Sequence, residues 1–148
     1  MNFIKKQGFG FWAYLVVAIL AAVSLVFYVM NVNQPYYEDM NVSVVYVMVG
    51  ALVALVASLV LPQLGDNAIL NIVTDVCRVA ASALIILAGA TFIGMRVESF
   101  GYIYGSNLEL GNENAFVAGG QAITTIVLFV VTWILSLVAS FPKIVKKG

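Results

Sequence analysis

Four long apolar segments take up most of the chain, and the polar and charged residues lie almost wholly between and outside them. The segments cover about residues 11–30, 42–61, 68–95 and 115–141. A helix needs about 20 apolar residues to cross the ~30 Å hydrocarbon core of a bilayer, and each segment has that length. The pattern predicts an all-α integral membrane four-helix bundle that forms one domain over residues 1–148.

Composition agrees with a membrane location. Hydrophobic residues make up 63% of the chain and charged residues 9%, whereas soluble domains carry roughly 25% charged residues. The seven basic and seven acidic residues cancel, and no basic run indicates a nucleic-acid partner.

The chain has one cysteine, Cys77, and no histidine. The usual ligand sets of zinc, haem and iron–sulfur sites are therefore missing. The nucleophile–histidine–carboxylate arrangements of many hydrolases are missing too. We expect no catalytic residues, no cofactor and no metal site, and hence a protein that is not an enzyme.

The segments differ in how they begin and how long they are. The first follows Lys5 and Lys6 but is too long for a signal peptide and lacks a small-residue cleavage site, so we expect an uncleaved anchor helix. The third covers ~42 Å as a helix. Its residues 68–75 should therefore extend beyond the bilayer, unless the helix tilts strongly. Asp66 is expected to cap this third helix.

Basic residues indicate the orientation. Five of the seven lie in the two terminal tails, and the loops after the first and third segments are acidic. Because positive charge is retained on the cytoplasmic side, both termini should be cytoplasmic and both of these loops external. The expected location is the plasma membrane, as a multi-pass protein.

A polar stripe follows the third segment, because its members recur at three- and four-residue spacing. They include Asn71, Asp75, Arg78 and Ser82. Asp75 and Arg78 can form an ion pair near the cytoplasmic interface. We favour an anchoring or packing pair; an ion or proton pathway is the alternative.

A second stripe follows the fourth segment, again on one helical face. Its members are Gln121, Thr125, Thr132, Ser136 and Ser140. Such hydroxyls and amides join helices in packed bundles, which is the interpretation we favour. In an oligomer they could instead line a pore.

Pairs of small residues one helical turn apart occur in all four segments. They are Ala18 and Ala22, Gly50 and Ala54, Ala90 and Gly94, and Ala118 and Ala122. Small pairs let helix backbones approach closely in lipid. They favour either folding of the bundle or self-association.

Residues 97–114 form the longest polar stretch, and glycines at 101, 105 and 111 indicate turns. Its candidate recognition residues are Glu98, Tyr102, Tyr104, Asn107, Glu109 and Glu113. The oxygen-rich set could meet a partner, a ligand or a hard cation such as calcium, although the spacing matches no EF-hand. The alternative is a solvated loop whose aromatic rings lie among the lipid headgroups.

The stretch from Tyr102 to Asn112, continuing into Ala122, resembles the last loop of small uncharacterised four-span membrane proteins of Gram-positive bacteria. The resemblance implies a bacterial plasma-membrane protein and carries no known chemistry.

These patterns favour a non-enzymatic membrane protein that acts by association. It would be an accessory or structural subunit of a membrane assembly, or a homo-oligomer. Its partners would be the lipid bilayer and another membrane protein or a second copy. The alternative is a small transporter or channel subunit with a pathway along the polar stripes of the third and fourth segments.

Overall fold

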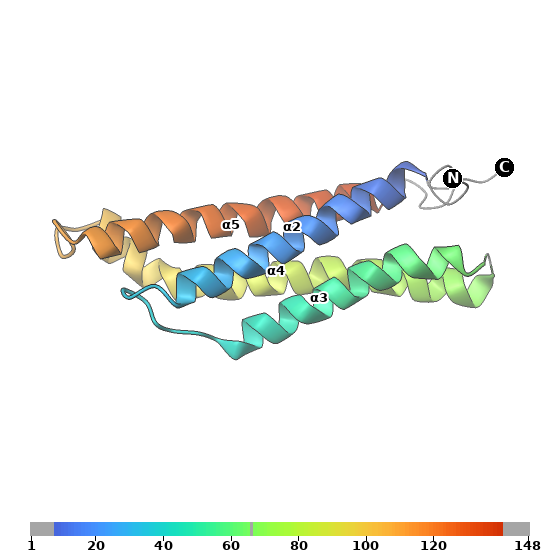
Figure 1. The fold of residues 1–148 in the computed structure, drawn as a ribbon, viewed down its shortest axis with the longest axis horizontal. Helices are drawn as coiled ribbons and strands as arrows, with labels where there is room; N and C mark the ends of the chain where they lie inside the picture. Colours follow the sequence, from blue (N-terminus) through green and yellow to red (C-terminus); the bar gives the residue numbers. More distant parts are fainter. Residues whose placement is uncertain (1–7, 66, 141–148) are drawn as a thin grey trace.

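A computed structural model describes residues 8–65 and 67–140. The elements are α2 (Phe9–Val32), α3 (Val42–Val60), the short 3₁₀ helix η1 (Leu61–Gln63), α4 (Ala68–Tyr104) and α5 (Glu113–Ala139). The four long helices run up and down in turn, and each packs against two neighbours, with α5 returning to lie beside α2 (Figure 1). The described residues include no strand, and the all-α four-helix fold is confirmed.

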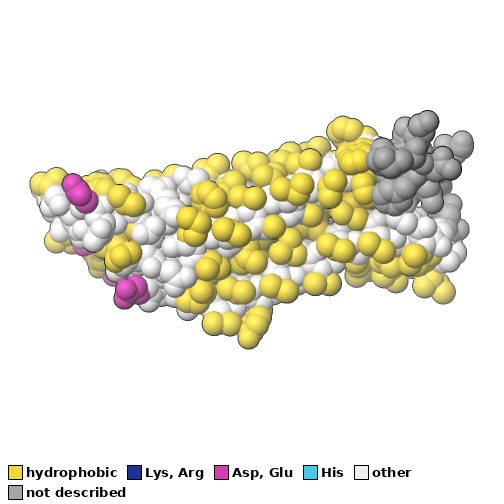
Figure 2. Space-filling model, viewed as in Figure 1, with side chains coloured by type: hydrophobic (Ala, Val, Ile, Leu, Met, Phe, Trp, Pro, Cys, Tyr) yellow, Lys and Arg dark blue, Asp and Glu magenta, His cyan; other side chains and the backbone are white. Residues whose placement is uncertain are grey.

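All four helices are long and apolar enough to cross a membrane. Apolar side chains cover the length of the bundle on the face seen in Figure 2, and carboxylates on that face gather at one end. Val53 and Val127 are examples of large aliphatic side chains that are more than half exposed. A soluble monomer rarely exposes apolar surface on this scale, so the chain is a multi-pass membrane protein.

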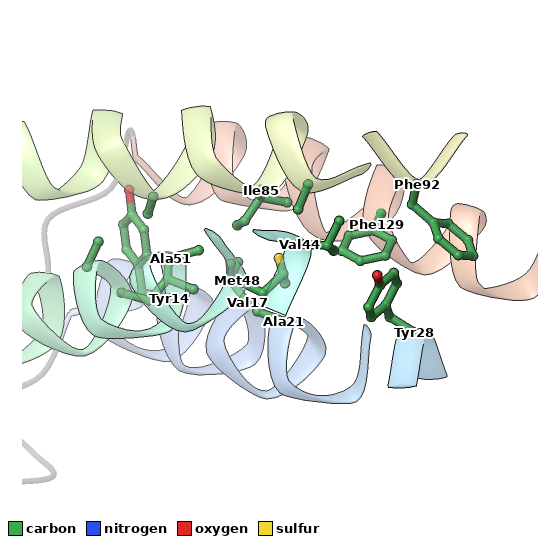
Figure 3. Packing of buried hydrophobic residues seen from close by; sticks show 14 of the residues in the cluster. Tyr14, Val17, Ala21, Tyr28, Val44, Met48, Ala51, Ile85, Phe92 and Phe129 are labelled. Carbon is green, nitrogen blue, oxygen red and sulfur yellow. The ribbon is translucent and has the colours of Figure 1, made fainter. Parts of the chain in front are cut away.

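The core runs along the bundle axis and is filled by aromatic and small side chains (Figure 3). The rings of Tyr28 and Phe92 meet edge to face at 5.4 Å, and Phe92 lies 6.0 Å from Phe129. Gly89 allows α4 to approach α5, because a Cβ atom there would lie 3.2 Å from the Cβ of Phe129.

Asparagines cap three of the helices. The side chain of Asn41 accepts from the amide of Ser43 and caps α3, and the side chain of Asn67 accepts from the amide of Leu70 and caps α4. Asn112 caps α5 in the same way. The cap expected at Asp66 lies outside the described residues, and its neighbour Asn67 performs that role.

The prediction that the third helix ends near residue 95 is wrong, because α4 continues to Tyr104. Ile103 is buried at 4% exposure, and the ring of Tyr104 meets that of Phe116 edge to face at 6.1 Å. This packing against α5 outweighs the weak helix propensity of Gly101. The loop therefore covers only residues 105–112, and the α4–α5 hairpin projects past the ends of α2 and α3 (Figure 1).

The start of α2 and the end of α5 lie at the same end of the bundle (Figure 1). We call this the terminal end; η1 lies there as well. The opposite end, which carries the loops 33–41 and 105–112, is the loop end. The lysines behind the predicted orientation, Lys5, Lys6, Lys143, Lys146 and Lys147, lie outside the described residues, so the orientation stays a prediction. The expected extension of residues 68–75 beyond the bilayer stays one too.

Candidate functional site

The two arginines of the chain lie on α4, 18 residues apart (96 − 78). At 1.5 Å per residue this separation is ~27 Å along the helix. The hydrocarbon core of a bilayer is ~30 Å thick. The two arginines are therefore about one hydrocarbon thickness apart along α4, Arg96 toward the loop end and Arg78 toward the terminal end.

Arg96 is completely buried, with 0% of its side chain exposed. Its Nη1 and Nη2 donate to the two carboxylate oxygens of Asp39 at 2.7 and 3.0 Å. Its Nε donates to Oδ1 of Asn31 at 2.8 Å. The guanidinium fork thus binds the carboxylate through two parallel hydrogen bonds, the strongest form of this pair.

Aromatic rings enclose the same guanidinium. Its central carbon lies 3.6 Å from the ring centroid of Tyr37 and 5.0 Å from that of Phe92. The hydroxyl of Tyr37 lies 3.0 Å from that of Ser99. Burial raises the pKa of the Tyr37 phenol above its ordinary value of 10, although Ser99 and Arg96 lower it. The phenol is therefore neutral at physiological pH and acts as a cation–π partner.

Amide side chains extend the network to α5. Nδ2 of Asn31 donates to the carbonyl of Ala118 at 2.9 Å and to Oε1 of Gln121 at 3.2 Å. Nε2 of Gln34 donates to the same Gln121 oxygen at 2.8 Å. We call Arg96, Asp39, Asn31, Tyr37 and Gln121 the Arg96 cluster. It ties α2, α4, α5 and the loop 33–41 together.

The loop 33–41 brings Asp39 to the cluster through a tight turn. Glu38 adopts a φ of 46°, in the left-handed region that non-glycine residues rarely occupy. The amide of Asp39 then donates to the carbonyl of Val32. Only Gln121 of the cluster was among the residues predicted from the sequence. The available signal was a lone arginine at the end of an apolar run with a carboxylate in a neighbouring loop.

Arg78 has a looser environment. Its Nη1 lies 3.8 Å from Oδ1 of Asp75, whose side chain is 74% exposed. The ring of Tyr14 lies 5.5 Å from the guanidinium carbon on the core side. Within the part of the chain that the structure describes, neither Nε of Arg78 nor the hydroxyl of Tyr14 has a hydrogen-bond partner, although both atoms are buried. The predicted pairing of Asp75 with Arg78 is thus present but weak.

A groove of about 290 Å³ opens beside Arg78, between α4 and α5. We call it the α4–α5 groove. Its lining residues are Arg78, Val79, Ser82 and Ala83 of α4, Trp133 and Leu137 of α5, and Ser140 at the C-terminal end of α5. The hydroxyl of Ser82 lies 2.8 Å from that of Ser136. The predicted α4 stripe therefore separates into an inner part at Ser82 and an outer part, where Asn71 is exposed.

The α5 stripe lies inside the bundle. Thr125, Thr132 and Ser136 are all fully buried. Thr125 and Thr132 donate to carbonyls of their own helix, and the Thr132 hydroxyl also lies 3.3 Å from that of Ser24 on α2. The hydroxyls of Thr132 and Ser136 therefore contact neighbouring helices of the same chain.

The predicted recognition residues fall on three elements instead of one loop. Glu98, Tyr102 and Tyr104 are on α4, Asn107 and Glu109 are in the loop, and Glu113 begins α5. Tyr102 donates to Glu98 one turn away, and Asn112 donates to Glu109. The described residues contain no group of three histidine, cysteine or acidic side chains that could hold a metal ion.

The small pairs also differ in where they face. Ala118 and Ala122 are buried against neighbouring helices. Ala90 and Gly94, in contrast, are both exposed on α4. A Cβ atom built at Gly94 would meet nothing within 4 Å among the described residues.

Comparisons with protein-family models, curated proteins and solved structures find no match to this chain.

Proposed function

We propose that this protein acts by association within the membrane, as an accessory or structural subunit of a membrane assembly or as a homo-oligomer. One observation carries the proposal: the Ala90–Gly94 pair faces outward from α4 with open space above it. Pairs of this kind are used where one membrane helix packs closely on another. Here the second helix would come from a different chain.

The surroundings of the pair suit a helix partner. Leu87 and Val97 are exposed at 52% and 61% on the same side of α4. Bulky side chains above and below two small ones make a shallow notch into which a partner backbone can fit. Association in lipid depends on such packing, because lipid chains are as apolar as the helix surface.

The Arg96 cluster supports a static scaffold. Its hydrogen bonds join three helices and a loop, so the outer surface of the bundle is held in one arrangement. A preformed surface loses less entropy when it binds. The projecting α4–α5 hairpin, with exposed Leu108 and Leu110 on either side of Glu109, supplies a second contact element on the loop side.

The location we propose is a bacterial plasma membrane with both termini cytoplasmic. The orientation rests on the five tail lysines and the acidic loops. The bacterial assignment rests on the resemblance of residues 102–122 to four-span proteins of Gram-positive bacteria.

A small transporter or channel subunit is the second candidate. The observation that favours it is the row of buried hydroxyls from Thr125 through Thr132 to Ser136, with Ser24 beside it. Against a pathway, Phe129 lies in the middle of this row and packs against Phe92. A pathway would also require these hydroxyls to leave the carbonyls of their own helix.

Photo-crosslinking in native membranes tests the association. A crosslinking amino acid placed at Ala90 should give a discrete protein adduct, either with a second copy or with another membrane protein. The matched position is Val127 on α5, which is exposed at 52% and lies outside the small pairs. Adducts with lipid alone from both positions would contradict the proposal.

A further inference from the structure

We propose that the α4–α5 groove is a binding site for an anionic phospholipid. The phosphate would contact Arg78, and one acyl chain would lie against Val79, Ala83 and Leu137. Three independent features point to this ligand: the position of the groove, the state of Arg78 and the nature of the walls.

The groove lies at the depth of a lipid headgroup. One side is formed by Trp133 and Leu137, in the last two turns of α5, and by Ser140, which directly follows that helix. Arg78 is ~27 Å from Arg96 along α4, close to the thickness of the hydrocarbon core. A phosphate at the boundary would thus meet Arg78, while the chain below it would run toward the middle of the bilayer.

Arg78 keeps hydrogen-bonding capacity for a phosphate. Its contact with Asp75 is long, at 3.8 Å, and the Asp75 carboxylate is mostly in solvent, so the pair is weak. The Arg78 side chain is still 18% exposed and lines the groove, so a phosphate there can reach it. The Tyr14 ring supports the guanidinium from the core side at 5.5 Å, with the hydroxyl end of Tyr14 directed toward α4 (Figure 3). A guanidinium held in this way suits a phosphate, whose oxygens accept from two of its nitrogens.

The walls suit hydrocarbon. Val79, Ala83 and Leu137 are apolar, and the Ser82 hydroxyl is already engaged by Ser136. A volume of about 290 Å³ matches the smallest ligand sites, so it accommodates part of one acyl chain. Free phosphate would leave these walls uncovered, and an acyl chain covers them.

Charge favours an acidic lipid over a zwitterionic one. Asp75 is the sole carboxylate that the described residues place toward the terminal end. The sequence adds five lysines within eight residues of the ends of α2 and α5, against one further carboxylate, Asp66, just before α4. Basic groups beside a membrane attract anionic lipids, and one basic residue contributes a preference of roughly fivefold.

The groove contains its own reporter, Trp133. The chain has one other tryptophan, Trp12, so the Trp12→Phe protein reports on the groove alone. This protein would be reconstituted in vesicles that contain phosphatidylglycerol or phosphatidylcholine with brominated acyl chains, which quench tryptophan on contact. We expect half-maximal quenching at a roughly fivefold lower fraction of phosphatidylglycerol.

Two variants separate the phosphate contact from the chain contact. In Arg78→Gln, quenching by phosphatidylglycerol should fall to the phosphatidylcholine level, while the tail lysines remain. Ala83→Phe fills the groove and should reduce quenching by both lipids. Val138→Phe places the same ring at an exposed position of α5 outside the groove lining and should change neither.

If the two lipids quench Trp133 equally in the Trp12→Phe protein with no further substitution, the proposal is overturned. A preference that survives Arg78→Gln would also overturn it, because the tails would then be its source. Quenching by neither lipid would mean that a protein, such as a second copy, covers the groove, which overturns the proposal as well.

Discussion

Arg96 carries a full charge inside the bundle, which is costly unless the charge is paired and its hydrogen bonds are satisfied. Asp39, Asn31 and two aromatic rings provide that compensation. The sequence could not show this, because Asp39 and Asn31 are 57 and 65 residues away along the chain. From the sequence Arg96 marks only the end of an apolar run, and the left-handed turn at Glu38 that presents Asp39 leaves no clear pattern.

Removing Asp39 should destabilise the protein, because it leaves a buried guanidinium without its counter-charge. We expect Asp39→Ala to lower the free energy of unfolding by about 2–3 kcal/mol, the low end for such pairs because Asp39 is 40% exposed. Asp75→Ala is the matched control and should cost less than about 1 kcal/mol, since Asp75 is mostly exposed and lies 3.8 Å from Arg78. Unfolding in mixed micelles measures both, and equal costs would show that Arg96 does not depend on Asp39.

Substitutions at the buried threonines of α5 distinguish a packing role from a transport role. Replacing Thr125 and Thr132 with valine keeps their shape and removes hydrogen bonds that average about 0.6 kcal/mol in membrane bundles. We expect a small loss of stability and no change in any ion flux through vesicles that contain the protein. A conductance that changes with Thr132→Val, and not with Val131→Ala on the exposed face, would favour the channel alternative instead.

The helices themselves could be predicted from the sequence, because long apolar runs have few alternatives in a membrane. The residues at which each helix starts and ends could be predicted less well. Tertiary contacts decide where α4 ends: Ile103 and Tyr104 pack on α5, whereas Gly101 and the nearby polar residues had favoured a loop. The α5 stripe was predictable as a face, but whether it faces a neighbour or a pore depends on which helix lies opposite.

The contact between α4 and α5 depends on Gly89. A Cβ atom there would lie 3.2 Å from the Cβ of Phe129, which is fixed to the backbone and cannot turn away. We expect Gly89→Ala to destabilise the bundle by about 1–2 kcal/mol despite its better helix propensity. Gly101→Ala, also within α4 but with open space around it, should be neutral or slightly stabilising. The same unfolding measurement applies, and a stabilised Gly89→Ala protein would show that the two helices can separate at little cost.

At the scale of the whole molecule, the start of α2 and the end of α5 lie at the same end of the bundle, so we expect both on one side of the membrane. We predict that this side is the cytoplasm. In a Cys77→Ser background, cysteines introduced at Asn2 or Gly148 should escape an impermeant thiol reagent added to intact cells. A cysteine at Asn107, in the loop 105–112, should react. Labelling at either terminus from outside would reverse the orientation and place Arg78 in the outer leaflet.

Hydrogen bonds between helices hold the interior of the bundle in place, whereas no described residue covers the outer face of α4 around Ala90 and Gly94. The buried polar groups are used to join helices, through the Arg96 cluster and the hydroxyl contacts of α5. We propose that the Ala90–Gly94 notch and the projecting hairpin contact other proteins, whereas the α4–α5 groove binds lipid. An association protein needs this division between a fixed core and an available face.

The most direct test is the mass of the complex extracted with its native bilayer in polymer-bounded discs. We predict an assembly larger than one chain for the native protein. Gly94→Leu fills the notch and should shift the mass toward a single chain. Gly120→Leu, the same change at an open and exposed glycine of α5, should leave the assembly intact. A native protein that runs as a single chain, or an assembly that survives Gly94→Leu unchanged, would contradict association through the outer face of α4.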